Sequence, residues 1–227
     1  MNLWEKFAKK DAEYYILSYK NVDYNSEEGQ QYFYRTGKEL MDLFLVRAEG
    51  HLRAKKSALE IGCGIGRLTI PHSGVFEKIS AVDISPTMLA KLKANALKRN
   101  ITNIEGFLPD GSWDKGSYDY VYSSIVFQHI ADWNIIRNYI NRISNCINDH
   151  GIIQIQFDTR PAGFLYRLRN MIPDFLLPKD QRKGIRRIRR TSKELRDLFM
   201  ANNLGILEEF NPDDENHTFI LKKRSAI

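Results

Sequence analysis

The segment ALEIGCGIGRLTI, residues 58–70, decides the fold of this chain. A short apolar run, Ala58 to Ile61, leads into glycines at the alternate positions 62, 64 and 66. Glycine is needed where the backbone takes a positive φ or where a ligand lies against bare peptide groups. The pattern therefore predicts a buried strand that ends in a tight turn and opens a helix. The free backbone N–H groups of that turn would face a ligand beyond the end of the strand.

An acid at the end of the next apolar run strengthens this prediction. The run from Lys78 to Val82 ends in Asp83. At this spacing a carboxylate lies at the tip of the neighbouring parallel strand, where it can accept hydrogen bonds from both hydroxyl groups of a ribose. Ile84 follows and offers an apolar face to a purine. The alternative, an ordinary turn with a surface aspartate, leaves the spacing between the glycines and the acid unexplained.

The glycine spacing differs from that of a dinucleotide-binding turn, which carries its third glycine one position later. That position holds Arg67. The pattern Glu60-x-Gly62-x-Gly64-x-Gly66 instead resembles motif I of the class I S-adenosylmethionine-dependent methyltransferases. The resemblance implies an enzyme that uses S-adenosyl-L-methionine as cofactor and releases S-adenosyl-L-homocysteine.

Other segments extend this resemblance over roughly residues 56–159 and, more loosely, 191–224. The third, fourth and fifth strands of the family are matched by residues 103–107, 118–124 and 151–157, and the turn and helix after the fourth strand by residues 126–130. We therefore expect an α/β, Rossmann-like fold with a seven-stranded, mostly parallel sheet and helices on both faces. Two apolar runs joined by turn residues 211–214 predict an antiparallel C-terminal hairpin.

The resemblance also implies which residues contact the cofactor. They are Glu60, Gly62, Cys63, Gly64, Gly66, Arg67, Asp83, Ile84, Met88, Asp110, Gly111, Ser123 and Ser124. Asp110 would accept a hydrogen bond from the adenine amino group, although Pro109-Asp110-Gly111 is also a good turn sequence. Ser123 and Ser124 would face the methionine moiety, or would only be polar residues at a strand end.

Two residues are candidate general bases. Transfer of a methyl group requires an aligned acceptor and, where the acceptor is a hydroxyl or an ammonium group, removal of its proton. His129 is the first candidate because its ordinary pKa of about 6.5 suits proton removal near neutrality. The alternative is that it braces the loop through a hydrogen bond. Asp158, at the end of the fifth predicted strand, is the second candidate.

Length and composition bound the class of protein. With 227 residues and 43% hydrophobic content, we expect residues 1–227 to form a single domain, with residues 1–50 as an N-terminal helical cap. Neither a membrane span nor a secretory leader is visible in the sequence. The two cysteines, Cys63 and Cys146, are too few for a disulfide framework, and the five histidines lack metal-ligand spacing. A cytoplasmic protein without a metal is the expectation.

Positive charge is concentrated in residues 160–190, which carry ten cations and two acids. This segment has a net charge of +8, whereas the rest of the chain has −2. Connections between a helix and a strand usually take about 2–6 residues, so we interpret the segment as a basic insertion that forms a lid. It could bind an anionic substrate, bind RNA, or be a solvated face.

Residues 179–190 contain no aromatic side chain on which bases could stack, which argues against nucleic acid. We therefore expect methyl transfer to an oxygen or nitrogen atom of an anionic small-molecule or lipid- or sugar-linked acceptor. The expected substrate-binding residues are Tyr19, Arg160, Arg186, Arg187, Arg189 and Arg190. An RNA methyltransferase and a non-catalytic module that binds the cofactor are the alternatives. The oligomeric state does not follow from the sequence.

Overall fold

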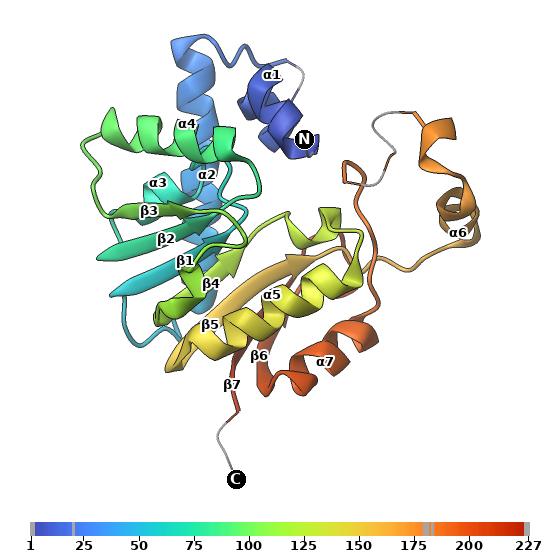
Figure 1. Cartoon of the computed structure of the whole chain (residues 1–227). Helices are drawn as coiled ribbons and strands as arrows, with labels where there is room; N and C mark the ends of the chain where they lie inside the picture. The colour runs from blue at the N-terminus through green and yellow to red at the C-terminus, as the bar shows by residue number, and fades with distance from the viewer. Residues whose placement is uncertain (1–2, 20, 179–181, 183, 225–227) are drawn as a thin grey trace.

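A computed structural model of the chain describes residues 3–19, 21–178, 182 and 184–224. At its centre is a seven-stranded sheet with the order β3-β2-β1-β4-β5-β7-β6 (Figure 1). The strands are β1 (Ser57–Ile61), β2 (Lys78–Val82), β3 (Ile104–Phe107), β4 (Tyr118–Ser123), β5 (Ile147–Phe157), β6 (Leu204–Phe210) and β7 (His217–Lys223). The first five strands run parallel, and β7 is antiparallel to both β5 and β6. The predicted fold class, including the C-terminal hairpin, is confirmed.

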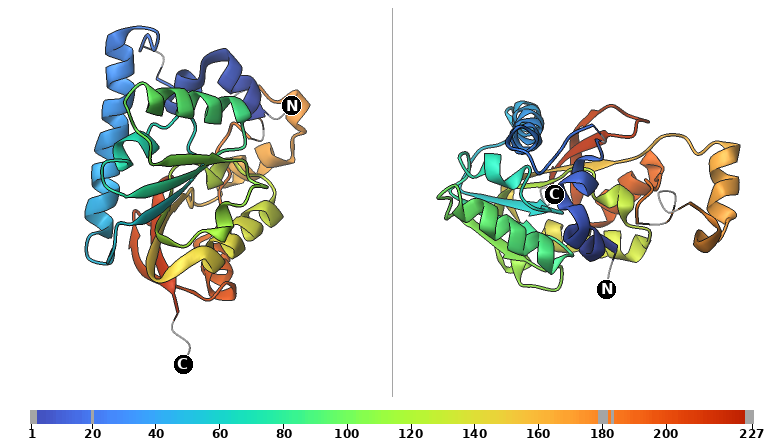
Figure 2. Two further views of the ribbon diagram at one scale, coloured as in Figure 1. Left: turned by 60° about the vertical axis from the view of Figure 1, so that its left-hand side comes forward. Right: turned by 90° about the horizontal axis from the view of Figure 1, so that it is seen from above.

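Helices cover both faces of this sheet (Figures 1 and 2). The α-helices are α1 (Leu3–Leu17), α2 (Glu27–Ala48), α3 (Thr69–His72), α4 (Pro86–Leu97), α5 (Trp133–Cys146), α6 (Phe164–Met171) and α7 (Ser192–Ala201). Three short 3-10 helices are η1 (Trp113–Lys115), η2 (Phe127–His129) and η3 (Asp174–Leu176). Within the described ranges, no helix combines the length and the apolar character needed to cross a bilayer.

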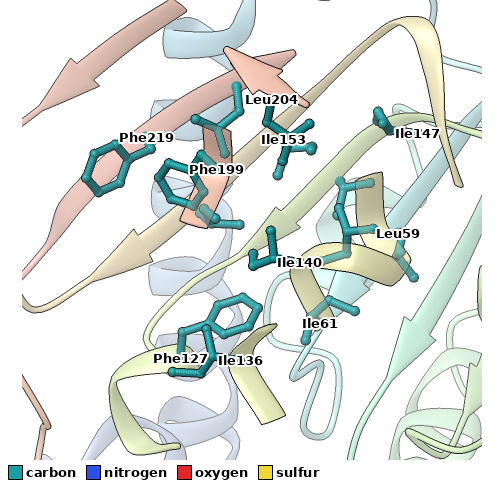
Figure 3. Packing of buried hydrophobic residues seen from close by; sticks show 14 of the residues in the cluster. Leu59, Ile61, Phe127, Ile136, Ile140, Ile147, Ile153, Phe199, Leu204 and Phe219 are labelled. Carbon is teal, nitrogen blue, oxygen red and sulfur yellow. The ribbon is translucent and has the colours of Figure 1, made fainter. Parts of the chain in front are cut away.

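Alternation along the strands builds a separate core on each face of the sheet. In β4, Tyr120 and Tyr122 pack with Phe44 of α2, whereas Val121 between them faces α5 and α7. Figure 3 shows the second core. Its labelled residues are Leu59, Ile61, Phe127, Ile136, Ile140, Ile147, Ile153, Phe199, Leu204 and Phe219. The two packed faces fix the register of the sheet, and with it the positions of the loops at the strand ends.

Side-chain caps begin three of the helices that follow the strands. Ser85 caps α4 by accepting from the backbone N–H of Met88, and Asp132 caps α5. Thr191 and Glu194 form the reciprocal capping box of α7. These caps determine where each connection from the carboxyl end of a strand turns into a helix.

The helix α1 contains a break. Asp11 has φ −167° and ψ 87°, outside the helical region, and its carboxylate accepts a hydrogen bond from the backbone N–H of Tyr14. The carboxylate thus begins a second short helical segment in the way an N-cap does. The helix α1 is therefore two helical pieces joined at Asp11, which changes the direction of the N-terminal cap.

The basic insertion leaves the sheet after β5 and returns beside it. It contains α6 and η3, which stand away from the α/β body (Figures 1 and 2). The chain returns at a parallel bridge between Asp158 and Arg189. Part of its charge, on Lys179, Asp180 and Lys183, lies outside the described residues. The return places residues 185–190 at the carboxyl end of the parallel strands.

Candidate cofactor and acceptor site

The glycine turn follows β1 directly, and its conformation requires glycine. Gly62, Gly64 and Gly66 have φ values of 79°, 54° and 94°. A Cβ atom on Gly62 would lie 2.2 Å from a methyl carbon of Val126. The backbone N–H groups of Gly62 and Cys63 donate to the carbonyl of Val82, at 2.7 and 3.0 Å, which joins the turn to β2. The predicted strand and turn are both present.

Asp83 lies beside this turn. One carboxylate oxygen accepts from the backbone N–H of Gly64 at 2.9 Å, and the other accepts from the backbone N–H of Ser85 at 2.8 Å. Burial raises the pKa of Asp83, and the two backbone hydrogen bonds oppose that rise. The carboxylate that the sequence predicts to bind a ribose is therefore held next to the glycine turn by the backbone on either side, with lone pairs left for further donors.

Glu60 lies beneath the turn, in the last part of β1. It is buried, and its Oε2 accepts from the hydroxyl of Thr69 at 2.6 Å and from that of Tyr122 at 2.8 Å. Burial raises its pKa to about 7 despite these two bonds. The contacts given for Glu60 are within the protein, so it braces the turn. Its direct contact with a cofactor stays a prediction.

The N-terminal helix α1 covers the glycine turn. The Cδ1 atom of Ile16 lies only 2.8 Å from the position that a Cβ on Gly64 would take. At the other end of the helix, Glu5 accepts hydrogen bonds from the hydroxyls of Ser85 and Thr87, at 2.6 and 2.7 Å. These bonds, together with Lys9 and the backbone N–H of Thr87, hold the pKa of Glu5 down at about 2. No motif in the sequence singles out Glu5 or Ile16, so sequence reasoning missed this cover.

The sequence of this region matches a known family. Residues 58–151 match the profile of a family described as a methyltransferase domain. The match identifies a methyltransferase domain over this segment, which is less than half of the chain. This match agrees with the predicted resemblance to S-adenosylmethionine-dependent methyltransferases, and the glycine turn with Asp83 supplies the bare backbone and the carboxylate that such a cofactor needs.

Known proteins show how far the similarity of this methyltransferase extends. Over 114 residues it is 30% identical to a protein of Methanosphaera stadtmanae named probable ribosomal RNA small subunit methyltransferase A. The match covers 50% of this chain and 41% of that protein, so the chain spans less than half of that relative's length. This similarity therefore concerns only part of each protein and does not identify the acceptor of the methyl group.

Solved structures share the fold of the whole methyltransferase. An S-adenosylmethionine-dependent methyltransferase of Clostridium acetobutylicum superposes with a TM-score of 0.66 at 17% identity, over 99% of this chain and 100% of that one. The magnesium protoporphyrin IX methyltransferase of Synechocystis, solved with bound S-adenosylhomocysteine, gives 0.64 at 15% identity, over 96% and 97%. At these identities the likeness describes the architecture and no shared acceptor.

The remaining predicted cofactor residues lie around the turn with differing exposure. Cys63 and Arg67 are buried, and Met88 is buried in the cluster under α1. Ile84 is half exposed. Asp110 is exposed, in a turn closed by a hydrogen bond from Gly111 N–H to Leu108 and braced by the guanidinium of Arg142. The turn that follows β3 is thus held in place independently of any ligand.

The two serines at the end of β4 make hydrogen bonds within the protein, and their contact with a cofactor stays a prediction. The hydroxyl of Ser123 is buried and donates to the carbonyl of Ile61 at 2.9 Å, and that of Ser124 donates to the amide oxygen of Gln156 at 2.7 Å. Both hydroxyls join neighbouring strands where the parallel sheet opens. Their geometry supports the alternative, polar groups that complete a strand end.

His129 lies in η2, against α1. Its ring packs edge-on to Trp4, with 5.7 Å between centroids. Burial and then the charge of Arg187 lower its pKa to about 4. The expectation of an ordinary pKa is therefore wrong, because the imidazole is removed from water beside a cation. The ring is neutral at pH 7, and its Nδ1 has no hydrogen-bond partner among the residues that the structure describes.

Asp158 is unavailable as a general base in this structure. Its buried carboxylate accepts two hydrogen bonds from the guanidinium of Arg160, at 3.0 and 2.5 Å. Arg160 also pairs with Glu215 at 3.0 Å, and these acids raise its pKa. Asp158 and Arg160, which the sequence assigned to catalysis and to substrate binding, thus form an ion pair with each other. Their closeness in the sequence alone did not show this pairing.

Three further predicted substrate arginines hold the insertion in place. Arg187 donates to the carbonyl of Glu215, Arg189 to that of Pro161, and Arg190 to those of Ile130 and Ala131. Tyr19 is exposed, and its ring packs edge-on to that of Tyr32 between α1 and α2. Their assignment to substrate binding is not supported by these contacts.

Arg186 differs from its neighbours. It is 8% exposed, and its Nε and one Nη have no hydrogen-bond partner among the described residues. The same holds for the side-chain amide of Gln128, which is completely buried. The backbone N–H of Ile188 donates to the carbonyl of Gln128 at 2.7 Å, so the segment of Arg186 lies directly against η2. Gln128 was missed because no motif marks it.

A cavity of about 760 Å³ opens far from this site. Its lining includes His150 and Gly151 at the start of β5 and Lys222 at the end of β7. It therefore lies at the amino-terminal ends of the parallel strands, whereas ligands of open parallel sheets bind beyond the carboxyl ends. Within the described part of the chain, no cluster of three or more His, Cys, Asp or Glu side chains could hold a metal ion.

Proposed function

We propose that this protein transfers the methyl group of S-adenosylmethionine to an oxygen or nitrogen atom of an acceptor that carries an anionic group. A small molecule or a lipid- or sugar-linked molecule fits this description. The observation that carries the proposal is the buried, incompletely bonded guanidinium of Arg186 at the carboxyl end of the sheet.

A buried guanidinium needs a partner. Removing a charge from water costs several kcal/mol unless hydrogen bonds or an opposite charge compensate. Arg187 and Arg160 receive that compensation from Glu215 and Asp158, whereas no described residue gives it to the Nε and one Nη of Arg186. A carboxylate or phosphate group on the acceptor would supply it, since guanidinium groups bind both in bidentate geometry.

The neighbouring polar groups support the same position for the acceptor. Gln128 offers an amide donor and acceptor, and His129 a neutral ring nitrogen, both on η2 directly after β4. The segment carrying Arg186 lies against η2, and Trp4 of α1 covers His129. Polar groups shielded from water in this way would bind an acceptor through hydrogen bonds.

The chemistry divides between the cofactor and these side chains. The cofactor, when bound, supplies a methyl group on a good leaving group, a thioether. The glycine turn and Asp83 would hold the cofactor, and α1 would exclude water. Arg186 and Gln128 would orient the acceptor for in-line attack. The neutral ring of His129 would receive the proton that a hydroxyl acceptor loses as its bond to carbon forms, or that an ammonium group must lose before its nitrogen can attack.

RNA methylation is the second candidate. It is favoured by one observation, the 30% identity over 114 residues to the protein named probable ribosomal RNA small subunit methyltransferase A. Against it, the described arginines of residues 186–190 are either buried or bonded to backbone carbonyls, which leaves few of them for phosphate contacts.

A direct test combines binding and turnover. Calorimetry with S-adenosylhomocysteine first establishes cofactor binding. Transfer of a tritiated methyl group is then screened against pools of anionic metabolites, lipids and RNA. We expect label in an anionic metabolite or lipid fraction. Label in RNA alone would support the second candidate, and binding without transfer to any pool would indicate a non-catalytic module.

A further inference from the structure

The helix α6 and the 3-10 helix η3 present apolar side chains to solvent. Phe164, Leu165 and Phe175 are 74%, 80% and 75% exposed. The same surface includes Leu168, Met171, Ile172 and Leu176, each at least 41% exposed. We call these seven residues the apolar projection. Contiguous large apolar side chains of this kind mark an interaction surface rather than ordinary surface composition.

The inner face of α6 is fixed, so that its apolar face points away from the domain. The hydroxyl of Tyr166 accepts a hydrogen bond from the backbone N–H of Arg189 at 2.9 Å. The guanidinium groups of Arg189 and Arg169 lie over its ring, at 4.5 and 5.4 Å from the centroid. Figures 1 and 2 show that the helix stands apart from the sheet.

Cations border the apolar face on both sides. At about 100° per residue, Phe164, Leu165, Leu168 and Met171 fall within an arc of about 120°. Arg167 and Arg169 lie just outside its two edges on this geometry. The only acid between Arg160 and Pro178 is Asp174. An apolar stripe with cations along its margins is the pattern of a helix that lies in a membrane interface, with its apolar side chains among the acyl chains and its cations at the headgroups.

We propose that the apolar projection docks this protein on the surface of a bilayer that contains anionic lipids. Charge complementarity favours this occupant, because Arg167 and Arg169 border the apolar face and the segment between Arg160 and Pro178 contains a single acid. A second copy of the chain would bring the same positive charge to the interface and be repelled. The inference does not depend on the acceptor or on methyl transfer.

Vesicle sedimentation tests the proposal. Full-length protein is mixed with vesicles of phosphatidylcholine alone or with 30% phosphatidylglycerol (about the anionic content that gives a strong surface potential). We expect binding to the anionic vesicles that weakens in salt. The variant Leu165→Glu/Phe175→Glu should bind at least roughly tenfold less, since it places charges in the apolar face. Leu97→Glu, an equally exposed leucine on α4, is the matched control and should bind as wild type does.

Two further measurements keep failure of the proposal distinct from loss of folding or of cofactor binding. All variants should bind S-adenosylhomocysteine equally in calorimetry. Analytical ultracentrifugation without lipid should show one and the same state for wild type and the double variant. Wild-type protein that ignores anionic vesicles, or a control variant that loses binding as fully as the double variant, would overturn the proposal. Self-association that the double variant abolishes would assign the surface to a second copy instead.

Discussion

The carboxylate of Glu5 accepts a hydrogen bond from the hydroxyl of Ser85 at 2.6 Å, across 80 residues of sequence. Ser85 also caps α4 and is two residues from Asp83, so this bond joins the N-terminal helix to the loop that holds the candidate ribose acceptor. The helix α1, which covers the glycine turn, is therefore attached to the loop that carries Asp83.

Removing this attachment should loosen α1. We expect Glu5→Ala to speed amide exchange across residues 3–17 and to speed dissociation of S-adenosylhomocysteine several-fold. Lys9→Ala is the control, because its pairing with Glu5 is a surface contact of small value. Since the pKa of Glu5 is held down at about 2, its contribution is complete above its ordinary value of 4.5 and is lost only as the pH falls toward 2. Unchanged exchange in α1 would argue against the attachment.

Asp83 is expected to set the affinity for the cofactor. Replacement by Ala removes an acceptor for the ribose hydroxyls and a partner of Gly64, which should cost about 2 kcal/mol, or roughly thirtyfold in affinity. Calorimetry with S-adenosylhomocysteine measures this directly. Asp83→Asn, which keeps the shape and one acceptor, should lie between the two. If wild type and Asp83→Ala bound S-adenosylhomocysteine with equal affinity, Asp83 would not be the acceptor for the ribose hydroxyls.

Glu60 should make cofactor affinity depend on pH near neutrality. Its pKa is raised to about 7 by burial, and the sulfonium of the cofactor favours the ionised form. The dissociation constant for S-adenosylmethionine should therefore fall as the pH rises from about 6 to about 8, and then level off. In Glu60→Gln this part of the dependence should vanish. A wild-type curve as flat as that of the variant would contradict the coupling.

Arg186 should act on the acceptor and not on the cofactor. Arg186→Gln is expected to raise the KM of the acceptor by roughly tenfold or more, with unchanged affinity for S-adenosylhomocysteine. The matched control is Arg137→Gln on α5, a position the sequence and structure leave outside the site. Replacing Arg187, Arg189 and Arg190 as well would be uninformative, because their backbone bonds hold the insertion in place.

The role of His129 shows in the pH profile. With its pKa lowered to about 4, the ring stays neutral from pH 8 down to about 5. If His129 takes the proton of the acceptor, its titration should leave turnover constant between about pH 8 and pH 5. Turnover should fall only at lower pH, where the ring becomes protonated. His129→Ala should lower turnover by roughly a hundredfold without changing cofactor affinity. Normal turnover in this variant would show that His129 has only a structural role, as the packing partner of Trp4.

The parts of the fold that follow from local sequence could be predicted. The strand and turn at residues 57–66 and the caps Ser85, Asp132 and Thr191 depend on neighbouring residues only. The serines at the end of β4 could not be judged in the same way. Whether a hydroxyl there faces a ligand or the next strand depends on Ile61 and Gln156, which are 62 and 32 residues away.

The roles of the individual charged residues were the hardest feature to predict from the sequence. Ten cations in one segment indicated an anion site as a whole, yet their partners differ residue by residue. Arg160 is neutralised by Asp158, Arg190 is bonded to backbone carbonyls, and Arg186 is buried without complete bonding. Only the fold determines which cation meets an acid, because those acids come from other strands and loops.

The position of β7 between β5 and β6 has a consequence for synthesis on the ribosome. The last strand of the chain fills an interior place in the sheet, where it pairs with β5 on one side and β6 on the other. Until residue 223 has left the exit tunnel, β5 exposes an open edge and β6 has no partner of its own, the kind of nascent state that recruits chaperones. A stop just before His217, which removes β7, would therefore leave a chain prone to aggregation, even though every residue of the cofactor loop would already have been made.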